Sequence, residues 1–245
     1  MTAILDSRVG KKLNDMILEL DIVIISFAKN IEFRKTTEAC VQSLLLSEQN
    51  IKFNVFIIES NNKEKYLSLK KFKNVKIVNP TTPFGYNKYL NIGISLGKSE
   101  YICLCNNDLI FKKGWATSII NAMNNDPFLL SASPYSTIPH KSKFGLEISN
   151  TVEYGHTIRR YLAGWCIFQK RKIYDIIGNL DEQFIFWYAD DDYAYTLKEK
   201  NLSHALVLNS VVEHIESKTL NSESISTRQK LTHDQKKIFN LKWKK

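Results

Sequence analysis

Short, nearly continuous apolar runs alternate with stretches of helical periodicity over the first 120 residues of the chain. An apolar run of this kind is typical of a strand in a parallel sheet, because helices cover both of its faces. Helices instead repeat their apolar residues every three or four positions. Strands are predicted at 22–27, 53–58, 75–78 and 101–105, and helices at 31–47, after Asn62 and at 86–97. The alternation predicts an α/β fold with a mostly parallel, doubly wound sheet and helices on both faces.

The second half of the chain is less regular. Residues 127–155 carry few apolar runs and indicate loops and short strands. Further strands are predicted at 161–168, 205–208 and 211–214, and helices at 170–178 and 193–200. Apolar periodicity at the start predicts a helical extension over 1–20. The sequence is thus divided into that extension, one domain over 21–220, and a basic C-terminal helix or tail over 221–245.

Polar residues directly follow three of the predicted strands: Ser26-Phe27, Glu59-Ser60-Asn61 and Asn106-Asn107-Asp108. Open α/β sheets bind ligands beyond the carboxyl ends of their strands, so we expect these ends to share a nucleotide-sized site. A carboxylate at the mouth of a buried strand, here Asp108, suits a hard cation that can hold a diphosphate. Asn-Asn-Asp also fits an ordinary turn, since these residues form local hydrogen bonds. Neither GxGxxG nor GxxxxGK[ST] occurs in the chain, which favours a cation as the diphosphate anchor.

Charge and cysteine content narrow the class of protein. The formal net charge is +9, which suits an anionic partner such as a nucleotide, a nucleic acid or an acidic lipid surface. A merely lysine-rich composition explains the charge equally well. The four cysteines lack zinc-like spacing and are expected to be buried free thiols, as in the cytosol. No window approaches the roughly 20 apolar residues that span a bilayer, so a cytoplasmic protein without a transmembrane segment is expected.

The order of these pieces resembles the GT-A glycosyltransferases, in particular family 2 and its rhamnosyltransferase-like bacterial and phage members. The resemblance covers roughly residues 20–220 and consists of five short matches in the family's order. They are Asn79 with Gly85-Tyr86-Asn87, Asn91 and Gly93; Tyr101 to Asp108, with Asn-Asn-Asp as the Asp-X-Asp-type motif; Gly164 to Phe168 with Gly178 to Phe184; Asp190-Asp191-Asp192; and Val212-Glu213-His214.

The resemblance implies a role for each matching residue. Asp108 is expected to bind Mn²⁺ or Mg²⁺, with His214 as a second ligand, although His214 also fits an ordinary histidine. Asp190 is expected to be the general base and Asp192 its orienting or capping partner. A nucleotide-diphosphate sugar is expected to contact Ser26, Phe27, Glu59, Asn61, Gly85, Asn87, Asn91, Asn106 and Asn107. Arg159, Arg160 and Lys218 are candidates for further charge against the diphosphate, or are surface residues.

The run Asp190-Asp191-Asp192 supports a base on physical grounds too. Like charges side by side against apolar surface raise a carboxyl pKa and bring its basicity nearer to neutral pH. The alternative is a cluster at a helix start, where the helix dipole stabilises carboxylates. The aromatic residues before it, and Trp165, fit either a stacking wall for a sugar or base, or the core. The chain departs from the family pattern at Ala189, where Glu is usual, and at Glu59, where Asp is common.

Together these features predict an inverting, metal-dependent glycosyltransferase. The resemblance implies a surface or lipid-linked glycan at the inner membrane face as the acceptor, where the basic tail would contact anionic lipid. An alternative acceptor is hydroxylated DNA, as in phages that glycosylate modified bases. Two other classes fit the sequence less well. A nucleotidyltransferase would carry a glycine-rich loop after the first strand, and Ser26-Phe27-Ala28-Lys29 lacks those glycines. A non-catalytic nucleic-acid-binding module could use the lysines around Trp243, but it leaves the carboxylates at the strand ends unexplained.

Overall fold

The computed structural model describes residues 17–61, 66–215 and 225–244. The first half of the chain alternates strands with helices, as predicted. Its elements are β1 (Leu18–Ser26), α2 (Ile31–Leu45), β2 (Ile51–Glu59), a 3₁₀ turn (Leu67–Leu69), β3 (Val75–Val78), α3 (Tyr86–Leu96) and β4 (Tyr101–Asn106). β1 pairs in parallel with β2 and β4, and β2 pairs in parallel with β3.

The second half contains shorter elements and three further long helices. They are β5 (Leu109–Phe111), α4 (Trp115–Asn125), β6 (Ser131–Tyr135), a π-helical turn (Thr137–Lys141), α5 (Ser142–Phe144), β7 (Val152–Tyr154), β8 (Cys166–Lys170), a 3₁₀ turn (Arg171–Ile173), α6 (Tyr174–Ile177), α7 (Ala189–Glu199), β9 (His204–His214) and α8 (Ile225–Trp243). β9 is one continuous strand where the sequence predicts two.

The strands of the described part of the chain form a nine-stranded sheet in the order β3-β2-β1-β4-β8-β6-β9-β5, with β7 paired to β9. β8 runs antiparallel between β4 and β6, and β5 and β7 are antiparallel to β9. The predicted parallel arrangement therefore holds for β3-β2-β1-β4, whereas the other half of the sheet is mixed. An apolar run indicates burial on both faces but carries no information on strand direction, which explains the difference.

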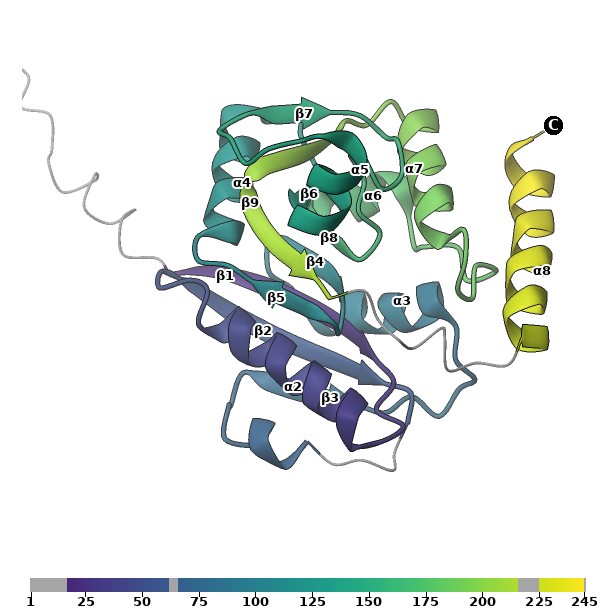
Figure 1. Ribbon diagram of the computed structural model, residues 1–245, viewed down its shortest axis with the longest axis horizontal. Coiled ribbons are helices and arrows are strands. Elements are labelled where there is room, and N and C mark those ends of the chain that lie inside the picture. The colour runs from purple at the N-terminus through teal and green to yellow at the C-terminus, as the bar shows by residue number, and fades with distance from the viewer. Residues whose placement is uncertain (1–16, 62–65, 216–224, 245) are drawn as a thin grey trace, which may run out of the picture.

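Helices cover the sheet on both faces, as predicted. Along β1, Leu20, Ile22 and Ile24 belong to the core under α2 and α4, whereas Val23 and Ile25 belong to the core under α3 and α7. This alternation is the two-residue period of a strand. In Figure 1, α2 lies on the near side of the sheet, and α8 stands at the edge of the molecule beyond the loop that precedes α7.

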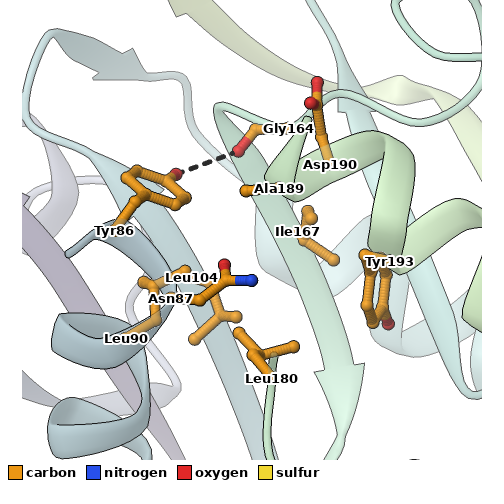
Figure 2. Close-up of a pocket in the computed structure, with 10 residues that line it drawn as sticks. All are labelled: Tyr86, Asn87, Leu90, Leu104, Gly164, Ile167, Leu180, Ala189, Asp190 and Tyr193. Carbon is orange, nitrogen blue, oxygen red and sulfur yellow. Dashed lines mark hydrogen bonds between the residues drawn. The ribbon is translucent and has the colours of Figure 1, made fainter. Parts of the chain in front are cut away.

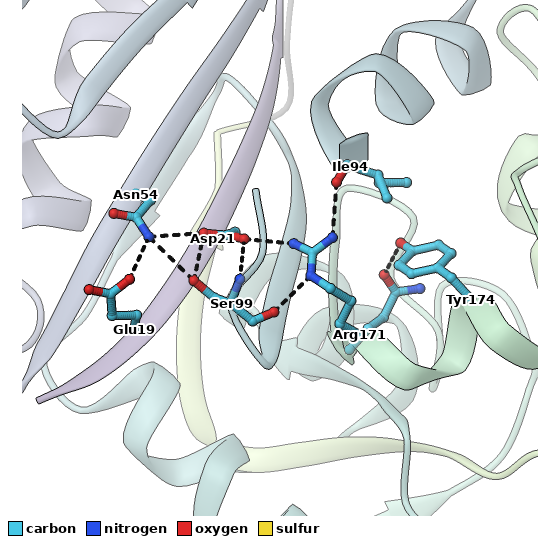
Figure 3. Close-up of polar contacts among 8 residues, drawn as sticks. Glu19, Asp21, Asn54, Ile94, Ser99, Arg171 and Tyr174 are labelled. Atoms are coloured by element: carbon cyan, nitrogen blue, oxygen red, sulfur yellow. Dashed lines mark hydrogen bonds and ion pairs between the residues drawn. The ribbon is translucent and has the colours of Figure 1, made fainter. Parts of the chain in front are cut away.

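A buried ion pair ties distant segments together near the amino ends of the parallel strands. Asp21 is only 1% exposed, and Arg171 Nη2 donates to its Oδ2 at 2.6 Å. The other guanidinium nitrogens donate to the carbonyls of Ser99 and Ile94. Asp21 also accepts hydrogen bonds from Ser99 and from the Asn54 amide (Figure 3). β1, the segment before β4 and the end of β8 are therefore joined near the amino ends of the parallel strands.

The two ends of the chain differ from the prediction in one respect. Residues 1–16 of the expected helical extension lie outside the described residues, but Leu18–Leu20 are strand. The prediction of helix is wrong there, because Leu18 pairs with Ile51 and the ladder to β2 continues from it. The described part of the basic C-terminal segment is the helix α8. Within the described residues, no helix combines the length and the apolar character needed to cross a bilayer.

All four cysteines are buried free thiols, as predicted. Three of them, Cys103, Cys105 and Cys166, meet across β4 and β8 with Sγ atoms 3.4–3.9 Å apart. Burial raises the pKa of each of these three thiols well above its usual value. The three thiols belong to the buried core between β4 and β8.

Candidate active site

The turn after β4 places a buried carboxylate at the carboxyl end of the sheet. Asp108 is 2% exposed, and neither of its carboxylate oxygens has a hydrogen-bond partner among the described residues. β5 pairs antiparallel with β9, so Leu109 lies opposite His214. This register brings His214 Nε2 to 3.3 Å from Asp108 Oδ2. The two residues predicted to bind one cation are therefore neighbours.

These two side chains fit a divalent cation. A buried carboxylate without partners is costly unless a positive charge compensates it. Carboxylate oxygen suits Mg²⁺ and Mn²⁺, and imidazole nitrogen is a common ligand of transition metals. Mg²⁺ is often held by one or two carboxylates together with substrate phosphates, so two protein ligands leave positions for a diphosphate. The carboxylate suits both ions, whereas the imidazole suits Mn²⁺, a transition metal, better than Mg²⁺.

Neighbouring side chains fix the orientation of His214. The Trp165 ring stacks on the imidazole with centroids 5.4 Å apart and planes 14° apart. The His214 backbone N–H donates to Ser136 Oγ at 3.2 Å. The adjacent Glu213 accepts hydrogen bonds from Thr137 N at 3.0 Å and from Thr137 Oγ1 at 2.6 Å. The end of β9 is thereby tied to the segment after β6, and Trp165 joins the site.

Gly164, directly before Trp165, contacts the other half of the site. A Cβ at Gly164 would lie 2.7 Å from both Cβ and Oδ2 of Asp190, so only a glycine allows Asp190 to pack here. Two successive residues therefore connect the predicted metal site with the predicted base. Gly164 contacts Asp190, and Trp165 stacks on His214. Figure 2 shows the Gly164 backbone between the side chains of Tyr86 and Asp190.

Tyr86, the first residue of α3, links the same groups. Its hydroxyl lies 3.1 Å from Asn106 Oδ1 and 3.3 Å from the Gly164 carbonyl oxygen and shares its proton between them. Burial, then the charge of Asp190 and, more weakly, that of Asp108 raise the pKa of this hydroxyl, which stays a neutral donor. The sequence marks Tyr86 only as part of a motif. Its place at a helix start beside the strand ends is the signal that indicates a role.

Asp190 lies in the first turn of α7, together with Asp191 and Asp192. It is half-buried beside a cavity of about 20 Å³ that is lined mainly by apolar side chains (Figure 2). Burial, and then the negative charge of Asp191, raise the pKa of Asp190 to about 6, against the opposing effects of backbone hydrogen bonds and of the Arg159 charge. The carboxylates therefore lie at the start of a helix, as one interpretation of the sequence expects. Asp190 also has a raised pKa, as the other interpretation expects.

Asp192, predicted to assist the base, points elsewhere. Residues two apart on an α-helix are separated by about 200° around its axis. The Asp192 carboxylate is buried and binds α8, where Trp243 Nε1 donates to its Oδ1 at 2.7 Å and Lys242 Nζ lies 2.8 Å from the same oxygen. The Asp192 carboxylate therefore contacts α8 and not the Asp190 carboxylate, so any orienting effect on Asp190 passes through the first turn of α7.

A comparison with protein families matches residues 21–179 to glycosyl transferase family 2. The match covers more than half of the chain. The chain belongs to this family. The matched range includes β4 and Asp108 but ends before Asp190, His214 and α8, so the roles of those three parts depend on the geometry described above.

Solved glycosyltransferases share the fold. The crystal structure of GalNAc-T7 with UDP, GalNAc and Mn²⁺ has a TM-score of 0.60 and 13% identity, and the match covers 81% of this chain and 43% of that one. The structure of S. aureus TarS 1–349 has a TM-score of 0.59 and 10% identity, with coverage of 89% and 70%. The predicted GT-A fold is confirmed. The chain spans less than half of the GalNAc-T7 chain, and no curated protein sequence matches it.

In this family 2 chain, the ends of β1 and β2 form a buried polar network. Ser26 Oγ contacts the hydroxyls of Thr37 and Tyr66 at 2.9 and 2.8 Å, and the Asn107 amide donates to Thr37 Oγ1 at 2.8 Å. Glu59 is 1% exposed. It accepts hydrogen bonds from the N–H groups of Ala28 and Asn61 and from the Tyr66 hydroxyl. Ser26 and Glu59 therefore shape this rim, whereas Phe27, Asn61, Asn106 and Asn107 are half-buried along it.

Gly85, Asn87 and Asn91, the three predicted donor contacts at α3, take no part in this polar network. The Asn87 amide donates to the Asp181 carbonyl at 2.9 Å, and the Asn91 amide donates to the Leu180 carbonyl at 2.9 Å. The N–H groups of Tyr86 and Asn87, which follow Gly85, donate to the carbonyls of residues 185 and 184. The prediction that Gly85, Asn87 and Asn91 bind the cofactor directly is therefore not supported by their contacts, which hold the turn before α7.

The basic residues predicted to oppose a diphosphate have different surroundings. Arg159 is exposed and lies close enough to Asp190 and Asp191 for its charge to oppose the rise that burial causes in the pKa of each. Arg160 stacks over the rings of Phe144 and Tyr161 at 5.8 and 5.1 Å. Lys218 lies outside the described residues. Arg159 is therefore the basic side chain of this group that lies beside the predicted base.

Proposed function

We propose that this chain is an inverting, metal-dependent glycosyltransferase that uses a nucleotide-diphosphate sugar as its donor. One observation carries the proposal: Asp108, 2% exposed and without a hydrogen-bond partner among the described residues, lies 3.3 Å from His214 Nε2. Through Gly164 and Trp165, this pair is connected to a carboxyl group with a pKa of about 6.

Asp108 and His214 would hold Mn²⁺ or Mg²⁺, and Trp165 would restrict rotation of the imidazole ring. When bound, the cation supplies the positive charge that stabilises a departing nucleoside diphosphate. The rim residues Phe27, Asn61, Asn106 and Asn107 would contact the donor over the ends of β1, β2 and β4. GalNAc-T7 was crystallised with UDP and Mn²⁺, which supports a nucleotide donor and a divalent ion on this fold.

Asp190 would act as the general base. The acceptor oxygen forms a bond to the anomeric carbon, the bond from that carbon to the diphosphate oxygen breaks, and the acceptor proton passes to the Asp190 carboxylate. A pKa of about 6 leaves most of this group ionised at neutral pH, yet more basic than an ordinary aspartate. Attack on the face opposite the leaving group inverts the configuration at the anomeric carbon.

The acceptor we propose is a lipid-linked or surface glycan at the cytoplasmic face of a membrane. The net charge of +9 supports an anionic surface as its setting, with peripheral rather than spanning contact. The same charge supports hydroxylated phage DNA as the second candidate acceptor. Membership of glycosyl transferase family 2 favours either acceptor over a non-catalytic nucleic-acid-binding module.

Binding experiments separate the two acceptor classes. The full chain is titrated at low salt with plain duplex DNA and, separately, with vesicles containing acidic phospholipid. Binding to vesicles without binding to DNA supports the glycan acceptor and removes the DNA version. Salt-sensitive binding to DNA alone supports the DNA acceptor and contradicts the membrane setting.

The test of the site uses donor hydrolysis and donor binding across a panel of nucleotide sugars, with and without Mn²⁺. Asp108→Ala should abolish metal-dependent donor binding, because it removes the buried anionic ligand. Asp190→Asn should bind donor normally and lose transfer, because the amide cannot accept the proton. Asp175→Asn, an exposed acid on α6, should change neither property. Equal loss of donor binding in both site variants contradicts their separate roles, and a chain that neither binds nor turns over any donor contradicts the proposal.

A further inference from the structure

Helix α8 packs against the rest of the molecule with one face. Gln235, Phe239, Lys242 and Trp243 are spaced as i, i+4, i+7 and i+8, which places them on one side of a helix. Gln235 and Phe239 are 2% and 4% exposed. Lys236, Lys237 and Lys244 are exposed. The packed face of α8 contacts α7 and the loop of residues 181–188, which leads into α7 two residues before Asp190.

Gln235 binds the backbone of that loop. Its Oε1 accepts a hydrogen bond from Ile185 N at 2.7 Å, and its Nε2 donates to the Gln183 carbonyl at 3.1 Å. The Ile185 carbonyl in turn accepts from Tyr86 N at 2.9 Å. The loop is therefore held between α8 on one side and the start of α3 on the other.

Phe239 packs at the point where the loop becomes α7. Its ring lies 5.3 Å from the ring of Tyr188 and 5.1 Å from that of Tyr195. Tyr188 has a φ of 63°, a left-handed conformation that persists in a non-glycine residue only when its surroundings enforce it. Its carbonyl accepts the Asp192 N–H at 2.8 Å. Tyr188 thus sets the direction of the first turn of α7, two residues before Asp190.

Lys242 and Trp243 bind the carboxylates on either side of the loop. Lys242 Nζ lies 2.8 Å from Asp181 Oδ2 and 2.8 Å from Asp192 Oδ1. Trp243 Nε1 donates to the same Asp192 oxygen at 2.7 Å. The start of the loop and the first turn of α7 are thereby joined through α8, and Asp192 holds the turn that carries Asp190.

We propose that α8 positions the general base: Gln235, Phe239, Lys242 and Trp243 hold the loop 181–188 and the first turn of α7, and thereby place Asp190 for transfer to the acceptor. This inference rests on the role proposed above for Asp190. The four side chains act through the loop and α7, so they are positioning residues. Losing them lowers the rate of transfer and leaves the Asp108–His214 side of the site unchanged.

The test compares matched lysine variants on the two faces of α8. Lys242→Met removes the charge between Asp181 and Asp192, Lys242→Arg keeps it, and Lys237→Met alters the exposed face. A misplaced base lowers kcat for transfer by about 10- to 100-fold in Lys242→Met, because small displacements of catalytic groups have effects of this size. The donor Kd in the presence of Mn²⁺ stays within about twofold. Lys242→Arg restores kcat, and Lys237→Met matches the wild type. Trp243→Phe, which removes the N–H to Asp192 and leaves a smaller ring beside Tyr195, is the second variant if Lys242→Met fails to fold.

Amide hydrogen exchange supplies a readout that does not depend on activity. Exchange across residues 181–192 should rise in Lys242→Met, while exchange across β4 and β5 stays at the wild-type level. Unchanged exchange in this loop overturns the inference. Faster exchange with wild-type kcat also overturns it, because the loop would then be held without affecting the base. If the wild type transfers no sugar, the proposed function fails and this inference with it, whereas exchange still reports whether α8 holds the loop.

Discussion

Asp108 and Asp190 show how the surroundings of a side chain set its chemistry. Asp108 is almost fully buried, beside an imidazole and without a hydrogen-bond partner among the described residues, so a cation suits it. Asp190 is half-buried against apolar side chains and next to another carboxylate, and these surroundings raise its pKa to about 6. Two chemically identical groups are thus suited to metal binding and to proton transfer, respectively.

The raised pKa of Asp190 predicts the pH dependence of transfer. Only the ionised carboxylate accepts a proton, so kcat/KM for the acceptor should rise with pH, pass through its midpoint near pH 6 and level off above it. Burial is the largest cause of the raised pKa, and the charge of Asp191 is the next. Asp191→Asn removes that charge, which lowers the pKa of Asp190 and moves the acidic limb to lower pH.

The measurement is kcat/KM over pH 4.5–8.5 at fixed ionic strength and saturating donor. Glu199→Gln, an exposed acid at the far end of α7, is the control and should leave the profile in place. A profile that Asp191→Asn does not move, or one without an acidic limb, contradicts the assignment of Asp190 as the base.

At the scale of elements, α3 supports the loop before Asp190, the proposed base. Its first turn gives N–H groups to residues 184 and 185, and its asparagines hold residues 180 and 181. Asn91 both donates to the Leu180 carbonyl and accepts from the Leu180 N–H at 3.0 Å. An amide side chain is needed for this two-way contact, which explains asparagine at this position without a ligand.

This support predicts a change in stability without a change in donor binding. Asn91→Ala leaves the Leu180 backbone groups without their partner and should lower the free energy of unfolding by about 1 to 3 kcal/mol. Ser95→Ala, on the exposed side of the same helix, should stay within about 0.5 kcal/mol of the wild type. Urea denaturation measures both variants, and the donor Kd is measured in parallel. Loss of donor affinity at wild-type stability would restore the cofactor-binding role expected from the resemblance.

The sequence predicts elements better than it predicts contacts. The apolar runs of β1, β2 and β4 mark buried parallel strands, and their polar ends mark the rim where Asp108 lies. Asn87 and Asn91 belong to a motif that suggests a ligand. Their hydrogen-bond partners are instead the carbonyls of Asp181 and Leu180, which lie far from them in the sequence. Asp192 likewise stands in a run of acids, but its partner is α8. The direction of a polar side chain depends on tertiary packing, which no local pattern contains.

For the whole molecule, the candidate site lies at the carboxyl ends of the parallel strands, and a buried ion pair lies near their amino ends. The carboxyl ends of β1, β2 and β4 carry Ser26, Glu59 and the turn with Asp108. Near the opposite ends, Asp21 and Arg171 join segments that are far apart in sequence (Figure 3). A Cβ at Gly97 would lie 2.1 Å from Asp21 Oδ2, so the chain there fits closely around the carboxylate. The site and this ion pair are thus at separate ends of the sheet.

This separation predicts that breaking the buried ion pair reduces stability and leaves catalysis per folded molecule unchanged. Arg171→Met leaves the Asp21 charge buried, and the loss of one partner of such a pair costs about 3 to 5 kcal/mol. Lys52 and Glu19 form a pair at the same end of the sheet, but their side chains are 53% and 46% exposed, so Lys52→Met should cost at most about 1 kcal/mol. Urea denaturation gives the free energies, and kcat is normalised to the folded fraction. An Arg171→Met variant that is fully folded but slower in transfer would show that the two ends of the sheet are coupled.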